Sequence, residues 1–258
     1  MTELREYCEK DLQEIIRIWR EAFGDSEESI ACFYRLLPGF GSSLVAVEGG
    51  KPVAVASAVE GRIGDKQCAY IYAVCVDSAF RGFGIGKAIS KGISDFAKAR
   101  GAEIISGLPA DSARSVYFRK YMNVTPRIFR RKYEAAAAEG AAEKIGAEEY
   151  YTLREKLLEG RNHMSFPKAY IEYIDFLSTD CGGGIFKTSG GICACTVENG
   201  ICRMDEIISE NPGTDAGAVA YALGCGKAEY FLTAPSGEEY IVADRDIPKD
   251  LIYNLLCE

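Results

Sequence analysis

Apolar side chains follow two spacings along the first 133 residues. Residues 70–76 form a run of β-branched and aromatic side chains without a charge, which predicts a strand buried on both faces. Residues 85–100 carry apolar side chains three to four positions apart, which predicts an amphipathic helix. Residues 3–37 predict two further helices, residues 44–60 a hairpin, and residues 102–108 a second strand. The pattern predicts an α/β (α+β) fold with a sheet flanked by helices.

The chain after Tyr133 begins a second pattern. The stretch EAAAAEGAAEKIGAEE is rich in Ala and Glu and predicts a helical linker or a helix end that leads into a new unit. Residues 227–235 follow the pattern of residues 101–109 at a constant shift of 126, and upstream of them a hairpin, a strand and a helix recur. We therefore expect a domain over 1–134, a linker over 135–148 and a smaller second domain over 149–258.

A glycine-rich turn joins the strand at 70–76 to the helix that follows. Gly82, Gly84 and Gly86 permit close approaches that a Cβ would obstruct, so that successive N–H groups can point at one anion. A strand, an amide-rich turn and a helix N-terminus together predict a pyrophosphate site. The spacing fits neither a Walker A loop nor the dinucleotide-binding fingerprint, because Ala88 follows Lys87 and Lys87 stands where a third glycine would be needed.

The remaining pattern, Arg81-x-x-Gly84-x-Gly86 after a strand, resembles the signature of the GNAT superfamily of acyl-CoA-dependent N-acetyltransferases. The resemblance implies a mixed, mostly antiparallel GNAT-type sheet for residues 1–134, and a degenerate GNAT-like second half. The phosphate loop does not recur in that half. Residues 210–215 carry two carboxylates and fewer glycines, which would repel a pyrophosphate, so we expect no CoA there.

The resemblance implies acetyl-CoA as co-substrate and gives its binding residues as Val74, Cys75, Val76, Arg81, Gly82, Phe83, Gly84, Ile85, Gly86 and Lys87. A backbone N–H on the strand at Val74–Val76 would polarise the thioester carbonyl, and Tyr117 would protonate the departing thiolate. The helix motif around Tyr117 matches only in part, because Ala110 replaces the usual Asn and Tyr121-Met122 replaces Gly-Phe.

The general base stays open at the level of sequence. No carboxylate lies between Ala69 and Val76. The candidates are Glu60, the phenol of Tyr70 or Tyr72 acting through a water, and the terminal carboxylate at Glu258.

Composition predicts a soluble, cytoplasmic protein that is not embedded in a membrane. Hydrophobic residues make up 48% and charged residues 26% of the chain, no apolar stretch reaches the roughly 20 residues that span a bilayer, and the N-terminus is charged. Ten cysteines without a C-x-x-C pair indicate reduced, mostly buried thiols. Cys193 and Cys195 are expected to pack rather than bind metal, and the single His163 has no partner for catalysis, so no metal is expected.

Charge restricts the partners. A net charge of −8 argues against nucleic-acid binding. Two interpretations stay open for a local basic cluster: counter-charges for the CoA phosphates, or a solvated helix face and strand edge. That cluster consists of Arg114, Arg119, Lys120, Arg127, Arg130, Arg131 and Lys132.

Three functions follow. The first is an acetyltransferase that moves an acetyl group from acetyl-CoA to a primary amine of a small molecule or a peptide by direct attack. The others are a non-catalytic acyl-CoA sensor and a structural partner-binding protein. The overall charge favours a small or cationic amine as acceptor. The oligomeric state is left open.

Overall fold

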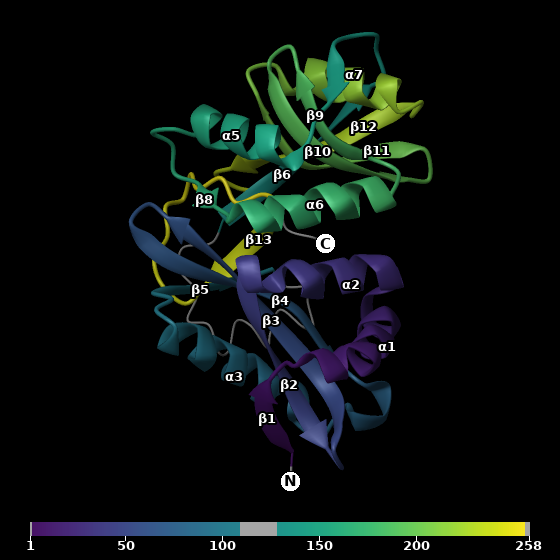
Figure 1. The fold of residues 1–258 in the computed structure, drawn as a ribbon. Coiled ribbons are helices and arrows are strands. Elements are labelled where there is room, and N and C mark those ends of the chain that lie inside the picture. The colour runs from purple at the N-terminus through teal and green to yellow at the C-terminus, as the bar shows by residue number, and fades with distance from the viewer. Residues whose placement is uncertain (1, 109–127, 256–258) are drawn as a thin grey trace. The chain divides into compact units, whose positions relative to one another are not determined.

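The computed structural model describes residues 2–108 and 128–255, which belong to two compact units (Figure 1). Unit 1 comprises Met1–Pro126 and Val242–Ile247, and unit 2 comprises Arg127–Ile241 and Pro248–Glu258. The boundary at 126/127 precedes the one expected from the sequence. The reason is that the strand Ile128–Ala136 pairs along eight positions with Lys227–Ala234 of unit 2.

Unit 1 is a mixed, mostly antiparallel sheet, as the sequence predicted. Its strands run in the order β1-β2-β3-β4-β5-β13, and only β4 and β5 are parallel. The last two residues of β13, Val242 and Ala243, supply the final pairing. The elements are β1 (Glu3–Glu6), η1 (Glu9–Asp11), α1 (Leu12–Phe23), α2 (Glu27–Leu36), η2 (Leu37–Gly39), β2 (Gly41–Glu48), β3 (Lys51–Ile63), β4 (Lys66–Val76), η3 (Ser78–Phe80), α3 (Ile85–Ala99), β5 (Ile104–Gly107) and β13 (Glu238–Ala243).

Helices lie on both faces of this sheet (Figure 1), and the side chains between helix and sheet differ from one face to the other. On one face, the apolar stripe of α3 packs on small side chains of β3 such as Ala54, Ala56 and Ala58, which let the helix lie close to the sheet. On the other face, Trp19 of α1 and Phe33 of α2 contact Tyr72 of β4 with ring centroids 5.6 and 5.4 Å apart. Burial of these rings is a major source of stability for unit 1.

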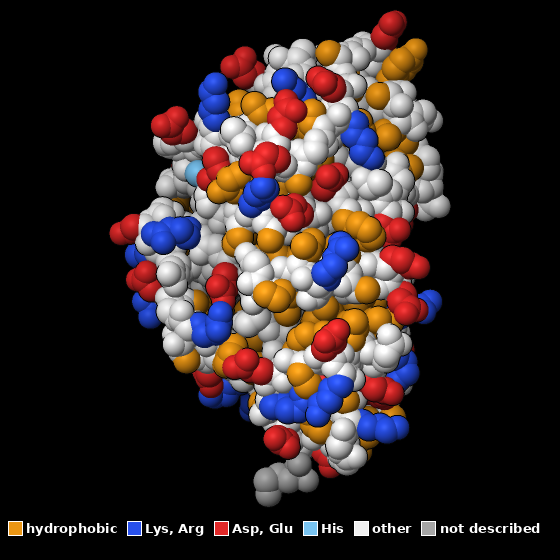
Figure 2. All heavy atoms as spheres, viewed as in Figure 1, with side chains coloured by type: hydrophobic (Ala, Val, Ile, Leu, Met, Phe, Trp, Pro, Cys, Tyr) orange, Lys and Arg blue, Asp and Glu red, His pale blue; other side chains and the backbone are white. Residues whose placement is uncertain are grey.

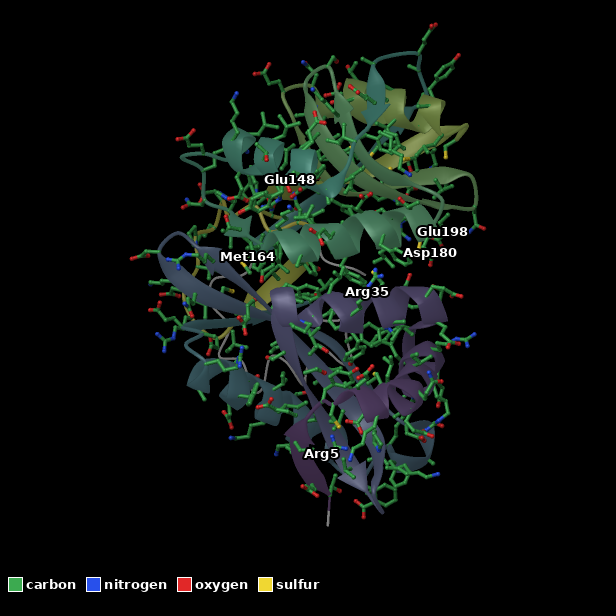
Figure 3. The ribbon with its side chains drawn as sticks, in the orientation of Figure 1. Arg5, Arg35, Glu148, Met164, Asp180 and Glu198 are labelled. Carbon is green, nitrogen blue, oxygen red and sulfur yellow. The ribbon has the colours of Figure 1, made fainter. Side chains whose placement is uncertain are left out.

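An ion pair fixes the chain start. Arg5, labelled in Figure 3, donates from Nη1 and Nη2 to the carboxylate of Asp11 at 2.6 and 2.8 Å. The hydrogen bonds from Arg5 lower the pKa of the nearly buried Asp11 to about 2. The bidentate geometry ties β1 to the start of α1.

Unit 2 contains a second mixed sheet in the order β13-β6-β12-β11-β10-β9-β7, in which only β11 and β12 are parallel. To this sheet β13 contributes its first residues, Glu238–Ile241. The other elements are β6 (Ile128–Ala136), β7 (Ala142–Lys144), α5 (Ala147–Leu157), β8 (Met164–Ser165), α6 (Lys168–Asp180), β9 (Gly184–Thr188), β10 (Gly191–Glu198), β11 (Ile201–Ser209), α7 (Pro212–Ala222) and β12 (Lys227–Ala234).

The helix predicted for the Ala- and Glu-rich stretch is wrong. Residues 134–136 end β6, residues 142–144 form β7, and the next helix starts only at Ala147. Ala135 pairs with Ala228 across the sheet, and its small side chain packs against the core of unit 2. Tertiary pairing has therefore overridden the helix propensity of alanine.

Four described cysteines of unit 2, Cys193, Cys195, Cys202 and Cys225, are core residues, whereas Cys181 is exposed. Cys193, Cys195 and Cys202 pack with Val219 and Ala220 of α7, and burial raises the pKa of the Cys193 thiol well above its usual range. Within residues 2–108 and 128–255, no cluster of His, Cys, Asp or Glu is arranged to hold a metal ion. No helix in the same part of the chain is long and apolar enough to cross a membrane.

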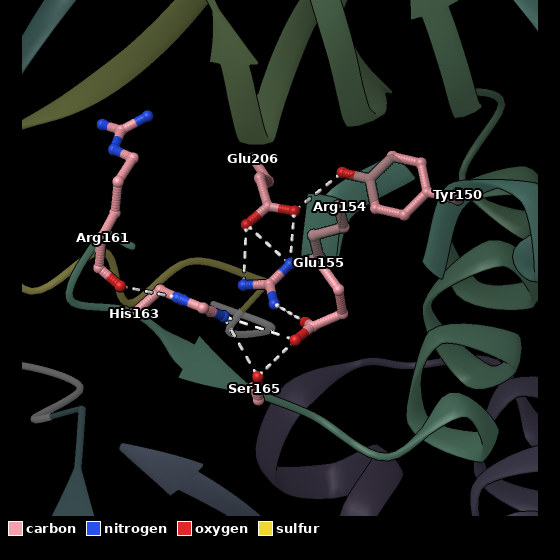
Figure 4. Close-up of polar contacts among 7 residues, drawn as sticks. All are labelled: Tyr150, Arg154, Glu155, Arg161, His163, Ser165 and Glu206. Carbon is pink, nitrogen blue, oxygen red and sulfur yellow. Dashed lines mark hydrogen bonds and ion pairs between the residues drawn. The ribbon is translucent and has the colours of Figure 1, made fainter. Parts of the chain in front are cut away.

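A buried polar network connects α5, β8 and β11 (Figure 4). Arg154 donates from Nε to Glu206 at 3.0 Å and from Nη2 at 3.2 Å, and both side chains are fully buried. The phenol of Tyr150 donates to the same carboxylate at 2.8 Å. Next to this pair, Glu155 accepts a hydrogen bond from Ser165 at 2.6 Å and faces Nε2 of His163 at 3.4 Å.

Removing one member of the buried pair should destabilise unit 2. Glu206→Leu leaves the Arg154 guanidinium without its carboxylate, which typically costs about 3–5 kcal/mol. We expect a loss of this size in the free energy of unfolding measured with urea. The double variant Arg154→Met/Glu206→Leu, which removes both charges, should recover most of the loss. Equal stability of single and double variants would contradict this view of the network.

His163 should make stability depend on pH. Its hydrogen bond with Glu155 raises the pKa of His163 above its ordinary value. A raised pKa in the folded state gives stability that is full below the unfolded value of about 6.5 and is lost as pH rises through the folded value. The melting temperature should therefore fall over this window, and the fall should be smaller in His163→Gln. An identical pH profile in that variant would exclude His163 as the source.

Candidate functional site

A β-bulge interrupts the pairing of β3 with β4. Val55 pairs with Cys75 and Ser57 pairs with Tyr72, so that Ala73 and Val74 both stand opposite a single residue of β3. Ala73 adopts a φ of +51°, a left-handed conformation that is uncommon for residues other than glycine. The bulge bends β4 and changes the direction of its backbone groups.

Strands β4 and β5 separate just before this bulge. Their parallel pairing runs from Cys68/Ile104 to Ile71/Gly107 and ends there. In the part of the chain that the structure describes, no strand pairs with Val74–Val76 on the side away from β3. The N–H of Asp77 donates to Val53 on β3 at 2.9 Å, so the alternation of a strand turns the N–H of Val76 away from β3.

The glycine loop lies directly between β4 and α3. Gly82 and Gly84 have φ of +88° and +82°, and a Cβ built on either would meet no atom within 4 Å. Gly84 precedes α3, and the N–H groups of Ile85 and Gly86 in the first turn have no acceptor within the helix. The loop thus presents amides and the positive end of the helix dipole.

Ion pairs hold the end of β4 in position. Arg81 donates from Nε to the carbonyl oxygen of Val76 at 2.9 Å, and its Nη2 lies 3.5 Å from Glu21 of α1. Asp77 pairs with Arg17 of α1 and accepts the N–H of Ala79 at 2.9 Å. The hydrogen bond from Arg17 lowers the pKa of Asp77, which therefore stays charged. These contacts give the Arg81 side chain a structural role in the loop.

The loop residues predicted to bind the co-substrate, 81–87, are thus contiguous with the strand residues 74–76 at one end of β4. Phe83 at the tip of the loop is 80% exposed, the highest value among the large apolar side chains of the described residues. Of the residues predicted to act in catalysis, the structure describes Tyr72 and Glu60.

Tyr72 and Glu60 occupy different surroundings. Tyr72 is buried between the rings of Trp19 and Phe33. Glu60 forms an ion pair with Arg100 at 3.3 Å and stands opposite Ala69, four residues before Ala73. At ~3.3 Å per residue, this places Glu60 about 13 Å along the strand from the bulge. Tyr117 and Glu258 lie outside the described residues.

Two members of the predicted basic cluster form contacts within unit 2. The guanidinium of Arg130 lies between the rings of Phe231 and Tyr240, at 3.9 and 4.2 Å from their centroids. Lys132 pairs with Glu229 at 2.7 Å. Arg114, Arg119, Lys120 and Arg127 are outside the described residues. On the face drawn in Figure 2, acidic and basic side chains are interspersed.

A small pocket of about 160 Å³ lies elsewhere in unit 1. Its lining includes Glu6 of β1, Tyr34 of α2, Ser42 near the start of β2 and Arg100 at the end of α3. It includes none of residues 72–87. It is therefore separate from the glycine loop.

Comparison with known proteins assigns a family to the part of the chain that contains the glycine loop. Residues 10–121 match the acetyltransferase (GNAT) family. The chain therefore carries a GNAT-family domain. GNAT proteins are acyltransferases that use acetyl-CoA, and their acceptors are amines. A search of curated proteins found no match.

Solved structures share the fold of the GNAT domain and of the rest of the chain. A GCN5-related N-acetyltransferase from Kribbella flavida aligns with a TM-score of 0.66 and 18% identity over 94% of this chain and 70% of its own. A conserved protein from Enterococcus faecalis gives 0.67 and 14% over 94% and 72%. A protein from Pyrococcus horikoshii gives 0.65 and 14% over 99% and 94%. At these identities the similarity establishes the fold alone.

The sequence missed two features of the GNAT domain. The bulge at Ala73 has no signature, since a glycine would have indicated a positive φ and alanine does not. The Arg17–Asp77 pair joins residues 60 positions apart, beyond any local pattern.

Substitutions at Ala73 should separate backbone strain from side-chain size. Ala73→Gly should keep or slightly raise the free energy of unfolding, because glycine adopts positive φ without a Cβ clash. Ala73→Val should lower it by about 1–3 kcal/mol, because a β-branched side chain is strained there. Urea denaturation measures both. Equal tolerance of valine and glycine would show that residue 73 does not hold the left-handed conformation in solution.

Proposed function

We propose that the chain is an N-acetyltransferase that transfers an acetyl group from acetyl-CoA to a primary amine by direct attack. The observation that carries this proposal lies at one end of β4, where a bulged strand edge that pairs with no second strand among the described residues joins a glycine loop at a helix N-terminus. The first suits an extended thioester arm, and the second suits a pyrophosphate.

Binding of acetyl-CoA would use backbone groups for the most part. The amides of loop 82–87 would face the pyrophosphate, where Gly82 and Gly84 leave open space for it. The edge of β4 at Val74–Val76 offers N–H and C=O groups to the amide-containing arm, in the manner of an added strand. One of these N–H groups would polarise the thioester carbonyl.

The chemistry is a single displacement. The neutral amine nitrogen attacks the thioester carbon, the C–S bond breaks, and the amine loses a proton to a base while the thiolate gains one. Tyr117 is the proposed proton donor to the thiolate. The proposed base is Glu60, or Tyr72 acting through a water. Tyr72 packs against the rings of Trp19 and Phe33, and Glu60 stands opposite Ala69, about 13 Å along the strand from the bulge.

A non-catalytic acyl-CoA sensor is the second candidate. It is favoured by the environment of Asp77, the carboxylate that directly follows Val74–Val76 in the chain, because Asp77 is bound to Arg17 and to the N–H of Ala79. Turnover of acetyl-CoA with a panel of small amines, polyamines and basic peptides separates the two. Release of CoA thiol with any acceptor supports the enzyme, and binding of acetyl-CoA without turnover supports the sensor.

Gly84→Asp should weaken CoA binding by well over tenfold, because a Cβ and a negative charge would meet the pyrophosphate. Titration calorimetry with CoA measures the effect. Gly50→Asp is a matched control, since Gly50 has a φ of +83° against +82° for Gly84 and open space around it, but lies in the β2–β3 turn. Equal CoA affinity of the two folded variants would remove the loop from the site.

Tyr117→Phe should lower turnover by about 10²-fold and leave CoA affinity nearly unchanged, because its hydroxyl would act only on the thiolate that develops during reaction. Steady-state rates at saturating substrates, together with calorimetry, measure both quantities. Wild-type turnover in the variant would assign the proton to another donor.

A further inference from the structure

Unit 2 repeats the core arrangement of unit 1. In unit 1 the order β2-β3-β4-α3-β5 gives two antiparallel pairings followed by a parallel one. In unit 2 the order β9-β10-β11-α7-β12 gives the same three pairings in the same sequence. Strand β11 therefore corresponds to β4.

The correspondence extends to the bulge and to the separation of the strands. In unit 2, Asp205 is the extra residue on β11, because Ala194 pairs with Glu206 while Cys195 pairs with Met204. Pairing of β11 with β12 ends at Arg203/Glu229, two residues before Asp205. In unit 1 the last pair, Ile71/Gly107, likewise precedes Ala73 by two residues. Both units thus open the sheet at the same point.

The anion site, in contrast, has no counterpart in unit 2. Only two residues separate β11 from α7, and α7 begins with Pro212, which has no N–H to offer. The buried carboxylate of Asp215 accepts hydrogen bonds from Ser209 Oγ at 2.5 Å, Ser189 Oγ at 3.1 Å and Gly190 N–H at 3.2 Å. A fixed negative charge therefore lies in the first turns of α7, where it disfavours a phosphate.

The C-terminal segment Leu251–Leu255 lies where β11 and β12 separate. The N–H of Leu255 donates to the carbonyl oxygen of Asp205 at 3.4 Å, and Thr233 Oγ1 on β12 donates to the carbonyl oxygen of Leu251 at 3.5 Å. Asp205 and Thr233 both lie beyond Arg203/Glu229, the last pair that joins β11 to β12. Tyr170 of α6 donates to the carbonyl oxygen of Leu255 at 2.8 Å.

Further contacts hold the middle of this segment. The N–H of Met164 on β8, labelled in Figure 3, donates to the carbonyl oxygen of Ile252 at 2.9 Å, and the N–H of Ile252 donates to Asn162 at 2.8 Å. Leu251 and Leu255 are fully buried. The segment is therefore held by backbone hydrogen bonds and by apolar side chains, as a bound peptide would be, and it has a left-handed backbone at Leu255, with φ +62°.

We infer that the gap between β11 and β12 beyond the pair Arg203/Glu229 is a peptide-binding site, and that residues 251–255 of the same chain fill it. It takes an apolar polypeptide instead of the acyl arm of CoA. The comparison with an acyl arm rests on the proposed function, while the occupancy of the gap does not.

Exchange of the segment tests this inference on the full-length chain. Leu255→Asp places a carboxylate in a fully buried position and should release the segment. A fluorescent peptide of residues 248–258 carrying Cys257→Ser should then bind this variant at least tenfold more tightly than it binds the wild type. The same peptide with Leu255→Asp should not bind. A folded Leu255→Asp variant that fails to bind the first peptide would overturn the inference.

A gentler variant keeps the test valid if Leu255→Asp does not fold. Tyr170→Phe removes only the donor to Leu255, so hydrogen exchange at the amides of Ile252 and Leu255 should rise about fivefold, as expected for loss of one hydrogen bond. Tyr221→Phe, at a well-exposed position on α7, is the control and should leave exchange unchanged. Unchanged exchange in Tyr170→Phe would contradict the docking.

Acetyl-CoA titration keeps the two proposals apart. One acetyl-CoA per chain, in the wild type and in Leu255→Asp, is the expected result. A second equivalent bound by Leu255→Asp would overturn the peptide site. No acetyl-CoA binding at all would overturn the proposed function and leave the peptide exchange as an independent result.

Discussion

The register shift between β3 and β4 is the constraint on which the rest of unit 1 depends. One extra residue in β4 requires Ala73 to hold a left-handed backbone, a conformation that costs of order 1–3 kcal/mol and persists only where its surroundings fix it. Those surroundings are present on both sides. Before the bulge, Tyr72 is packed against Trp19 and Phe33, and after it Asp77 is tied to Arg17. Helix α1 therefore contacts β4 on both sides of the strained residue, through Trp19 before it and Arg17 after it. Because the glycine loop follows β4 directly, these contacts also position the loop.

Local signals in the sequence were sufficient for the strand, the loop and the helix around Gly84. The apolar run at 70–76, the glycine spacing and the helical period of α3 are all short-range properties, and the structure has elements at each of them. Long-range geometry was not accessible in the same way. Neither the bulge nor the contacts of Arg17 and Arg81 has a local signature, since each depends on which strand or helix lies alongside. The side chains proposed for catalysis are the part of the site that the sequence predicts least well, because their positions also depend on long-range contacts.

Propensity failed where tertiary pairing was strongest. The alanine-rich stretch after Tyr133 has the composition of a helix, yet residues 134–136 pair with β12 and residues 142–144 pair with β9, and the small side chain of Ala135 packs against the core of unit 2. Arg130 shows a related effect. A cluster of positive charge in the sequence suggested a phosphate site, but its guanidinium is stacked between two aromatic rings. A run of basic residues in a sequence shows that positive charges are present. It does not show which of them already contact other side chains of the protein.

The division of β13 between the two units affects how the chain folds during translation. Among the described residues, only Val242 and Ala243 pair antiparallel with β5. The Asp244 carboxylate accepts a hydrogen bond from the N–H of Ile105 at 2.8 Å and forms an ion pair with Lys98 at 2.7 Å. During synthesis, the edge of β5 therefore stays without this partner until almost the whole chain has left the ribosome. An unpaired edge invites pairing with other chains. The nascent protein is thus most exposed to aggregation between completion of β5 and the arrival of β13, an interval of about 130 residues of translation.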